Sequence, residues 1–134
     1  MKEFNWPIRV YYEDTDAAGV VYHSNYLKYM ERARTEWLRT LGFSQAVLRK
    51  ESETIIVISE IDIKFMKPAK LDDMLEVKST LIKVTRASFL FDQQIEKLQE
   101  KICVARVKGV CLDALTFKPR RLPAELKLEL AHDT

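Results

Sequence analysis

One long stretch of the chain carries the apolar period of a helix, and this constrains the fold more than any other feature. Between residues 25 and 41 the apolar side chains recur at steps of three and four and form one stripe. Ser24 or Asn25 is placed to cap its start, and Gly42 is placed to end it. The spacing predicts one helix, about 25 Å long. Its stripe consists of Tyr26, Met30, Ala33, Trp37 and Leu41.

Strand patterns surround this helix. One alternating segment precedes it, at residues 6–13, and the clearest one, with Ile61, Ile63 and Phe65 on one face, follows it and ends before Pro68. The alternation slips near Ser79 and Thr80, which suggests a bulge. Short links between the last strands favour antiparallel hairpins. The further segments are strands at 74–84, 87–96 and 102–112, a short helix at 44–50 and a terminal helical turn or two at 125–131.

A single helix can be buried only by a sheet that curls around it. The order of one strand, one helix and four strands therefore predicts an α+β domain spanning residues 1–134, with a curved antiparallel sheet of about five strands wrapped around one long helix. Ile82, Leu90, Val104 and Val110 fall opposite the core stripes. Apolar side chains on the outer face favour an oligomer.

Composition narrows the classes of protein. The formal charge is +2, with acidic and basic residues mixed along the chain, so nucleic acid is not expected as a partner. The beginning of the chain has no apolar run of signal-peptide length, and no stretch is long enough to span a bilayer, so we expect a cytoplasmic protein. Cys103 and Cys111 lie about 26 Å apart if they share one extended strand, too far for a disulfide.

The densest chemical signal lies just before the helix. Glu13, Asp14 and Asp16 place three carboxylates within four residues, and His23 follows close to the helix start. Crowded carboxylates raise one another's pKa, and a helix start offers free N–H groups to a developing negative charge. From pattern alone the alternatives stay open: a polar turn for the acids, a capping or packing role for His23, or a metal site from Asp14, Asp16 and His23.

A family resemblance covers nearly the whole chain. It is carried by Val10-Tyr11-Tyr12-Glu13-Asp14-Thr15-Asp16, by residues 19–27 and by Glu31-Arg32-Ala33-Arg34, and it extends through residues 68–76 and 118–120. These segments resemble the active-site region of the 4-hydroxybenzoyl-CoA thioesterase family, and within it the YbgC-type acyl-CoA thioesterases associated with the Tol-Pal system. Ala18 departs from the pattern, because close relatives often have glycine there.

The resemblance implies the hotdog fold, assembled as a dimer of dimers, and hydrolysis of acyl-CoA without a cofactor. It assigns the essential carboxylate to Asp16, the active-site histidine to His23 and a supporting tyrosine to Tyr12. Asp16 would attack the thioester directly or activate a water, and the N–H of His23 would polarise the carbonyl. An acyl carrier protein is a second candidate partner. The candidate partners for coenzyme A phosphates are Lys67, Lys70, Arg86, Arg120 and Arg121.

Two other functions remain at this stage. A hotdog dehydratase also acts on thioesters, but its chemistry centres on a histidine in another motif. A binding module for an acyl carrier or a phospholipid enzyme, linked to the Tol-Pal system, would hold its partner without turnover. Release of free thiol from acyl-CoA distinguishes hydrolysis from both.

Overall fold

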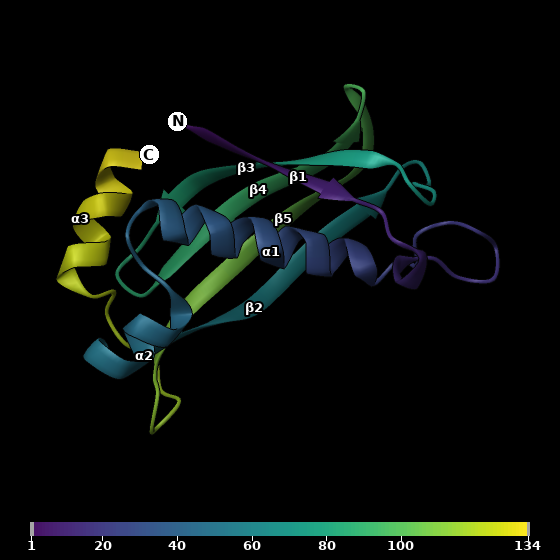
Figure 1. Cartoon of the computed structure of the whole chain (residues 1–134). Helices are drawn as coiled ribbons and strands as arrows, with labels where there is room; N and C mark the ends of the chain where they lie inside the picture. The colour runs from purple at the N-terminus through teal and green to yellow at the C-terminus, as the bar shows by residue number, and fades with distance from the viewer. Residues whose placement is uncertain (1, 134) are drawn as a thin grey trace.

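The computed structural model describes residues 2–133. Five strands form one antiparallel sheet in the order β1-β3-β4-β5-β2, so β1 and β2 are the two edges (Figure 1). The elements confirm the predicted α+β class. They are β1 (Glu3–Arg9), α1 (Asn25–Thr40), α2 (Gln45–Ser52), β2 (Thr54–Phe65), β3 (Met74–Val84), β4 (Ser88–Lys97), β5 (Glu100–Asp113) and α3 (Ala124–Asp133).

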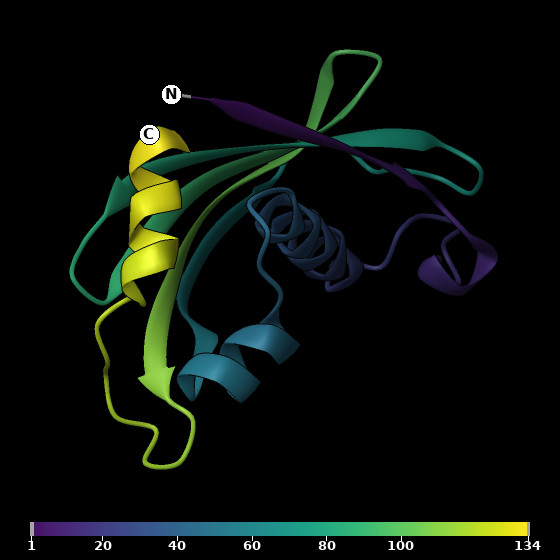
Figure 2. The ribbon, with the colours of Figure 1, turned by 60° about the vertical axis from the view of Figure 1, so that its left-hand side comes forward.

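The sheet curves around α1, which Figure 2 shows nearly end-on beneath the arc of the strands. Tyr26, Met30, Ala33 and Trp37 are all buried, as the stripe predicts, and Tyr29 is buried as well. The core side chains of the sheet alternate with outward-facing ones along β3, β4 and β5. Figure 1 places α2 and α3 at the opposite end of α1 from the loop that leads into it.

Gly109 allows an aromatic side chain to lie across β5. It pairs with Phe89 on one side and with Ile58 on the other. A Cβ added at Gly109 would lie 2.6 Å from the Phe89 ring, closer than real contacts permit. The missing side chain therefore leaves room for Phe89, whose ring packs edge-on against Phe91 at 5.7 Å between centroids.

The first strand ends earlier than predicted. β1 stops at Arg9, and residues Tyr12–Asp14 form a single 3-10 turn. Val10 still donates to the Asp73 carbonyl, but the N–H of Asp14 turns back to the Tyr11 carbonyl. The tyrosine at position 12 is therefore 83% exposed, although the alternation had placed it on the core face.

Two further expectations are corrected. The register shift in β3 falls between Leu81 and Lys83, not at Ser79, which keeps the alternation and is buried because its hydroxyl accepts from Gln93 Nε2 at 2.9 Å. Ser24 occupies the N-cap position of α1 with helical backbone angles, and its side chain makes no capping hydrogen bond. Asn25 is the first helical residue.

The edge strand β2 is longer and more exposed than predicted. It begins at Thr54. Its first half was not predicted, because that part is a continuous apolar run without the alternation that identifies a strand. Ile58, Ile61 and Phe65 are 39%, 36% and 47% exposed, respectively. The outward-facing Leu90 and Val104 are only half-buried among charged neighbours. Exposed apolar surface is thus greater on β2 than on the outer face of the sheet.

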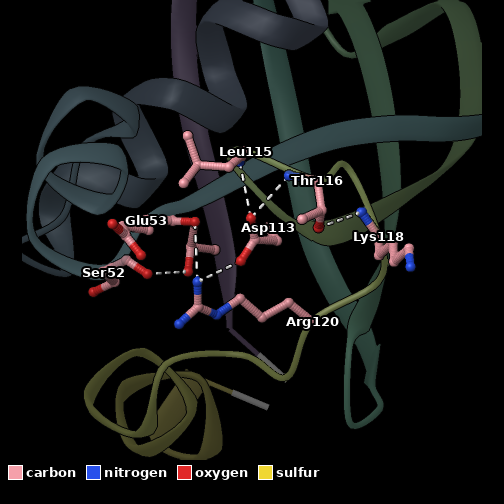
Figure 3. A network of polar contacts seen from close by, with 8 residues as sticks. Ser52, Glu53, Asp113, Leu115, Thr116, Lys118 and Arg120 are labelled. Carbon is pink, nitrogen blue, oxygen red and sulfur yellow. Dashed lines mark hydrogen bonds and ion pairs between the residues drawn. The ribbon is translucent and has the colours of Figure 1, made fainter.

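A polar latch joins the end of β5 to the start of β2 (Figure 3). The Asp113 carboxylate accepts from the N–H groups of Leu115 and Thr116 at 2.9 and 3.0 Å, and these bonds lower its pKa. Arg120 Nη1 donates to Asp113 Oδ2 and to the Glu53 carbonyl at 3.3 and 3.1 Å. Glu53 has a left-handed backbone at the end of α2, so the latch fixes the turn between α2 and β2.

Cys103 and Cys111 are both buried and free, which agrees with the expectation that they form no disulfide. Burial raises the pKa of the Cys103 thiol to about 12 and that of Cys111 to about 11. Across residues 2–133, none of the helices has both the length and the apolar composition needed to cross a membrane.

Candidate active site

A small hairpin carries Asp16 in front of α1. Thr15 and Val21 pair as an antiparallel bridge, and the N–H of Asp16 donates to the Val20 carbonyl at 2.9 Å. The turn closes where Gly19 donates to the Asp16 carbonyl, and Gly19 has a φ of +80°, which favours glycine. Ala18 does not have a positive φ, so alanine fits this turn without backbone strain.

The Asp16 carboxylate is exposed but oriented. Its Oδ1 atom accepts from the N–H of Ala18 at 2.8 Å, a side-chain-to-backbone bond typical of aspartate turns. One carboxylate oxygen is therefore held by the hairpin, while the side chain as a whole stays open to solvent. This arrangement suits a base or nucleophile, which must be fixed in direction and accessible to a substrate.

Asp14 has a different role from Asp16. Its side chain is buried, and its Oδ2 atom accepts from the N–H of Tyr11 at 2.8 Å. Its carbonyl accepts from the Tyr22 N–H at 3.0 Å and from Asn25 Nδ2 at 2.8 Å. The Asp14 carbonyl thus links the second arm of the hairpin, through Tyr22, and the first residue of α1, Asn25. Asp14 is therefore a structural residue.

A buried tyrosine lies beside Asp14. The Tyr29 hydroxyl is close enough to the Asp14 carboxylate to interact with it, although no hydrogen bond of ordinary geometry joins them in the described chain. Burial raises the pKa of the Tyr29 hydroxyl, and the Asp14 carboxylate raises it further. The hydroxyl therefore stays neutral.

His23 lies in an aromatic group at the end of β2. Its ring is 4.3 Å from that of Tyr22 and 6.2 Å from that of Phe65, measured between centroids. Phe65 also lies 5.8 Å from Tyr26, whose hydroxyl accepts from the Ala69 N–H at 3.0 Å. The histidine is exposed on its remaining side, so the candidate site adjoins the β2 edge.

Free backbone donors are present at the start of α1. Asn25 donates to the Tyr22 carbonyl and Leu27 to the Ser24 carbonyl, but within residues 2–133 no acceptor is described for the N–H groups of His23 and Ser24. Free N–H groups at a helix start favour negative charge. An oxygen that becomes negative during a reaction would be stabilised there.

The three sequence-predicted site residues share a region but not a hydrogen-bond network. Asp16 and His23 lie on the same connection between β1 and α1, and Tyr12 begins the 3-10 turn before it. In the described chain no hydrogen bond joins the side chains of these three residues to one another. Tyr12 contributes its carbonyl, which accepts from the Thr15 hydroxyl at 2.8 Å, and its ring faces solvent.

The five candidate residues for binding coenzyme A phosphates do not form one cluster. Lys70 is exposed and lies beside the Asp16 hairpin, because Val20 and Lys70 form a backbone bridge. Lys67 pairs with Glu100 at 3.0 Å, and Arg120 is held by the latch on Asp113. Arg86 and Arg121 are exposed, and the Arg86 carbonyl accepts from the N–H of Leu122, the residue after Arg121, shortly before α3.

A metal site from Asp14, Asp16 and His23 finds no support. Asp14 is already bonded beneath the hairpin, whereas Asp16 and His23 face outward. Among the side chains that the structure describes, no three or more His, Cys, Asp or Glu residues are grouped so that they could hold a metal ion.

Pattern reasoning missed Asn25 and Phe65 as parts of this region. Asn25 was expected only as a helix cap, yet its amide holds the Asp14 carbonyl. A buried asparagine beside an aspartate loop is the signal that could have found it, since such amides favour backbone partners. Phe65 is distant in sequence, and only the position of β2 brings it to His23.

Comparison with known proteins places the chain among thioesterases. Residues 10–130 match the family described as the thioesterase-like superfamily. The acyl-CoA thioesterase YbgC of Haemophilus influenzae is 44% identical over 129 residues, which cover 96% of this chain and 95% of that protein. The protein of the same name from Helicobacter pylori is 36% identical, with 89% and 93% covered.

Solved structures agree with these matches. A probable thioesterase from Bartonella henselae superposes with a TM-score of 0.87 at 34% identity, covering 91% of this chain and all of that one. The 1,4-dihydroxy-2-naphthoyl-CoA thioesterase of Synechocystis gives a TM-score of 0.89 at 25% identity, with 97% and 96% covered.

Proposed function

The chain belongs to the thioesterase-like superfamily and has the hotdog fold of an acyl-CoA thioesterase, and from this premise we propose that Asp16 is the carboxylate that cleaves the thioester. The observation that carries the proposal is the difference between the two aspartates. Asp14 is buried and bonded, whereas Asp16 is exposed and oriented through Oδ1. Asp16 alone of the two is available to a substrate.

In the proposed reaction the thioester carbonyl lies at the start of α1. The free N–H groups of His23 and Ser24 support this placement, because they would stabilise the oxygen as it becomes negative. Asp16 either attacks the carbonyl carbon, giving an anhydride that water then cleaves, or removes a proton from an attacking water. In both routes the carbon–sulfur bond breaks, and the products are a carboxylic acid and coenzyme A.

His23 and Tyr12 have supporting roles in this proposal. The His23 ring lies against Tyr22 and Phe65, so it is positioned to orient the water, to protonate the departing sulfur or to bind the substrate. Tyr12 is a substrate contact rather than a partner of Asp16, since its ring points to solvent. Lys70 is the best placed of the candidate cations for a coenzyme A phosphate, because it lies beside the hairpin.

We also propose that the protein works as an oligomer in the cytoplasm, as a dimer of dimers. Exposed Ile58, Ile61 and Phe65 support this, because β2 presents an unpaired edge that a second copy can extend. A copy placed there would approach His23 through Phe65 and enclose a site that is open in the single chain. A physiological link to the Tol-Pal system is part of the same proposal.

The experiment is a thiol-release assay on a panel of acyl-CoA substrates, with native protein and Asp16→Asn. We expect the variant to lose at least about a hundredfold in kcat while unfolding at the same temperature, since Asp16 is exposed and the asparagine oxygen can still accept from Ala18. Asp72→Asn is the matched control, at another exposed aspartate. Full activity in Asp16→Asn would refute the assignment.

The same assay tests the binding-module alternative. A protein that only holds an acyl carrier or a phospholipid enzyme would bind acyl groups without releasing thiol, and Asp16→Asn would leave that binding unchanged. The two buried protein thiols have raised pKa values and should add little background to a thiol reagent at pH 8.

A further inference from the structure

The β2–β3 connection, formed by the residues after the last of β2 and before the first of β3, lies against the Asp16 hairpin. Val20 of the hairpin pairs with Lys70 of this connection as a backbone bridge. The N–H of Val21 donates to the Ala69 carbonyl at 2.9 Å, and the N–H of Asp16 donates to the Val20 carbonyl at the same distance. The arm of the hairpin that holds the Asp16 backbone is therefore itself held by the β2–β3 connection.

Asp73 closes the β2–β3 connection as a turn and joins it to β4. Its Oδ2 atom accepts from the N–H of Lys70 at 2.9 Å, and its own N–H donates to the Lys70 carbonyl at 3.1 Å. Its Oδ1 atom lies 2.9 Å from the ammonium of Lys97, the last residue of β4, and the Asp73 side chain is only 14% exposed. Burial alone would raise the pKa of the Asp73 carboxyl, but the Lys97 ammonium and the Lys70 N–H outweigh it and hold the pKa below its usual value. Both carboxylate oxygens are thus in use, one within the turn and one toward β4.

The tip of the β4–β5 hairpin contacts the β2–β3 connection at two points. Residues 98–99 join the two strands with φ values of +49° and +68°, the left-handed pair that a tight two-residue hairpin turn requires. This turn places Lys97 opposite Glu100, so two opposite charges project from one tip. Lys97 pairs with Asp73, and Glu100 pairs with Lys67 at 3.0 Å. The second pair is more exposed on both sides, so the Asp73 contact is the better shielded of the two.

We infer that Asp73 is a positioning residue for thioester cleavage, because it ties the Asp16 hairpin to the tip of the β4–β5 hairpin. This inference rests on the proposed function, since Asp16 must be the reactive carboxylate. A displacement of about 1 Å at a reacting group costs about a hundredfold in rate, so a turn that holds the hairpin influences the reaction without touching a reacting atom. The path of described contacts consists of Lys97, Asp73, Lys70, Val20 and Asp16, in that order.

The test measures kcat and KM by thiol release for native protein and three graded variants. Asp73→Asn keeps an oxygen for the Lys70 N–H but loses the charge that attracts Lys97, and Lys97→Met removes the same attraction from the other side. Because partly exposed ion pairs are weak, each of these should lower kcat about 2- to 5-fold. Asp73→Ala also leaves the Lys70 N–H without its acceptor and should lower kcat about 10- to 100-fold.

A second substrate separates the position of Asp16 from that of Lys70, the candidate partner of a coenzyme A phosphate. Each variant is assayed with an acyl-CoA and with the N-acetylcysteamine thioester of the same acid, which carries no phosphate. We expect kcat to fall on both substrates, with KM nearly unchanged on the phosphate-free one. A rise in KM confined to acyl-CoA, with native kcat, overturns the inference and assigns the turn to coenzyme A binding.

Three further variants keep the result interpretable. Lys97→Arg retains the cation and should retain native kcat. Asp72→Asn changes the neighbouring exposed aspartate, whose described hydrogen bonds are all made by its backbone, and should also retain native kcat. Because Asp73 and Lys97 act through one contact, the double variant Asp73→Asn/Lys97→Met should lose no more than the larger single loss. Single losses that multiply in the double variant would overturn the shared path.

The outcomes separate the inference from the proposed function. Native kcat in folded Asp73→Ala, even with a lower melting temperature, overturns the positioning role and leaves Asp16 as the proposed carboxylate. If Asp73→Ala does not fold, native kcat in Lys97→Met overturns the inference instead, because that partly exposed side chain lies outside the hairpin. Full activity in Asp16→Asn, or no thiol release by native protein, refutes the proposed function and the inference with it.

Discussion

Asn25 is the residue through which the hairpin is joined to α1. Its Nδ2 atom donates to the Asp14 carbonyl, which also receives the Tyr22 N–H, so the hairpin and the helix start move as one unit. We predict that Asn25→Ala lowers kcat about 10- to 100-fold with little change in KM, because a small displacement of Asp16 misaligns the attack. Steady-state kinetics on the best acyl-CoA substrate measure both parameters.

Controls for this prediction separate positioning from stability. Asn25→Asp keeps the shape but replaces the donor with an acceptor, so it should be at least as impaired. Thr40→Ala removes a side-chain bond to the Trp37 carbonyl at the far end of the same helix and should leave kcat unchanged. If Asn25→Ala lowered only the melting temperature, the residue would be structural and the prediction wrong.

At this scale the sequence pointed to the correct segment but could not separate its two aspartates. Burial separates them, and burial depends on Tyr29 and the hairpin bonds, which are not visible in a short motif. Family resemblance proposes Asp16 as the reactive carboxylate, and its exposed, oriented side chain supports that proposal. Tyr12 shows the limit of alternation, because a 3-10 turn rotated it away from the core.

Among the elements, the central strands depend on one glycine. The Phe89 ring occupies the space that a side chain at position 109 would need, with its nearest atom 2.6 Å from the added Cβ. We predict that Gly109→Ala lowers the free energy of unfolding by about 1–3 kcal/mol, because overpacking displaces an aromatic ring. Urea unfolding followed by fluorescence measures the change.

A double variant checks the cause of that loss. Phe89→Leu shortens the ring that meets position 109, so Gly109→Ala should cost less in a Phe89→Leu background than in the native one. Equal costs in both backgrounds would mean that the clash is not with Phe89.

Elements with a clear period were predictable, and those without one were not. The helix at 25–41 and the strand at 74–84 match α1 and β3 almost residue for residue, since burial of one face imposes their period. The first half of β2 was missed because a run of four apolar residues fits a strand or a buried helix equally. Ser79 was misread as a bulge because a buried hydroxyl interrupts an apolar pattern.

For the whole molecule, the important surface is the edge of the sheet rather than its outer face. Sequence reasoning found apolar residues opposite the core and placed the contact between copies there. In the folded chain those residues are half-buried, whereas Ile58, Ile61 and Phe65 of the edge strand β2 are exposed. Which strand lies at an edge depends on the order β1-β3-β4-β5-β2, and chain order does not determine that.

The edge proposal predicts the effect of a single charge. Ile61 lies in the middle of β2, 36% exposed, opposite Val107 of β5. Ile61→Lys should disrupt pairing of two copies along β2, because a charged side chain on an edge strand opposes strand addition. Sedimentation velocity should show smaller assemblies than the native protein forms, and acyl-CoA hydrolysis should fall as they dissociate, since Phe65 carries the same edge to His23.

Leu128→Lys provides the comparison for that measurement. Leu128 is 62% exposed on α3. The Leu128→Lys variant therefore adds the same charge at an exposed apolar position away from β2. It should leave both the sedimentation coefficient and the activity unchanged. Equal dissociation by both variants would indicate a general effect of charge, and native-size assemblies in Ile61→Lys would place the contact elsewhere. A fully active monomeric Ile61→Lys would show that one chain completes the site without a neighbour.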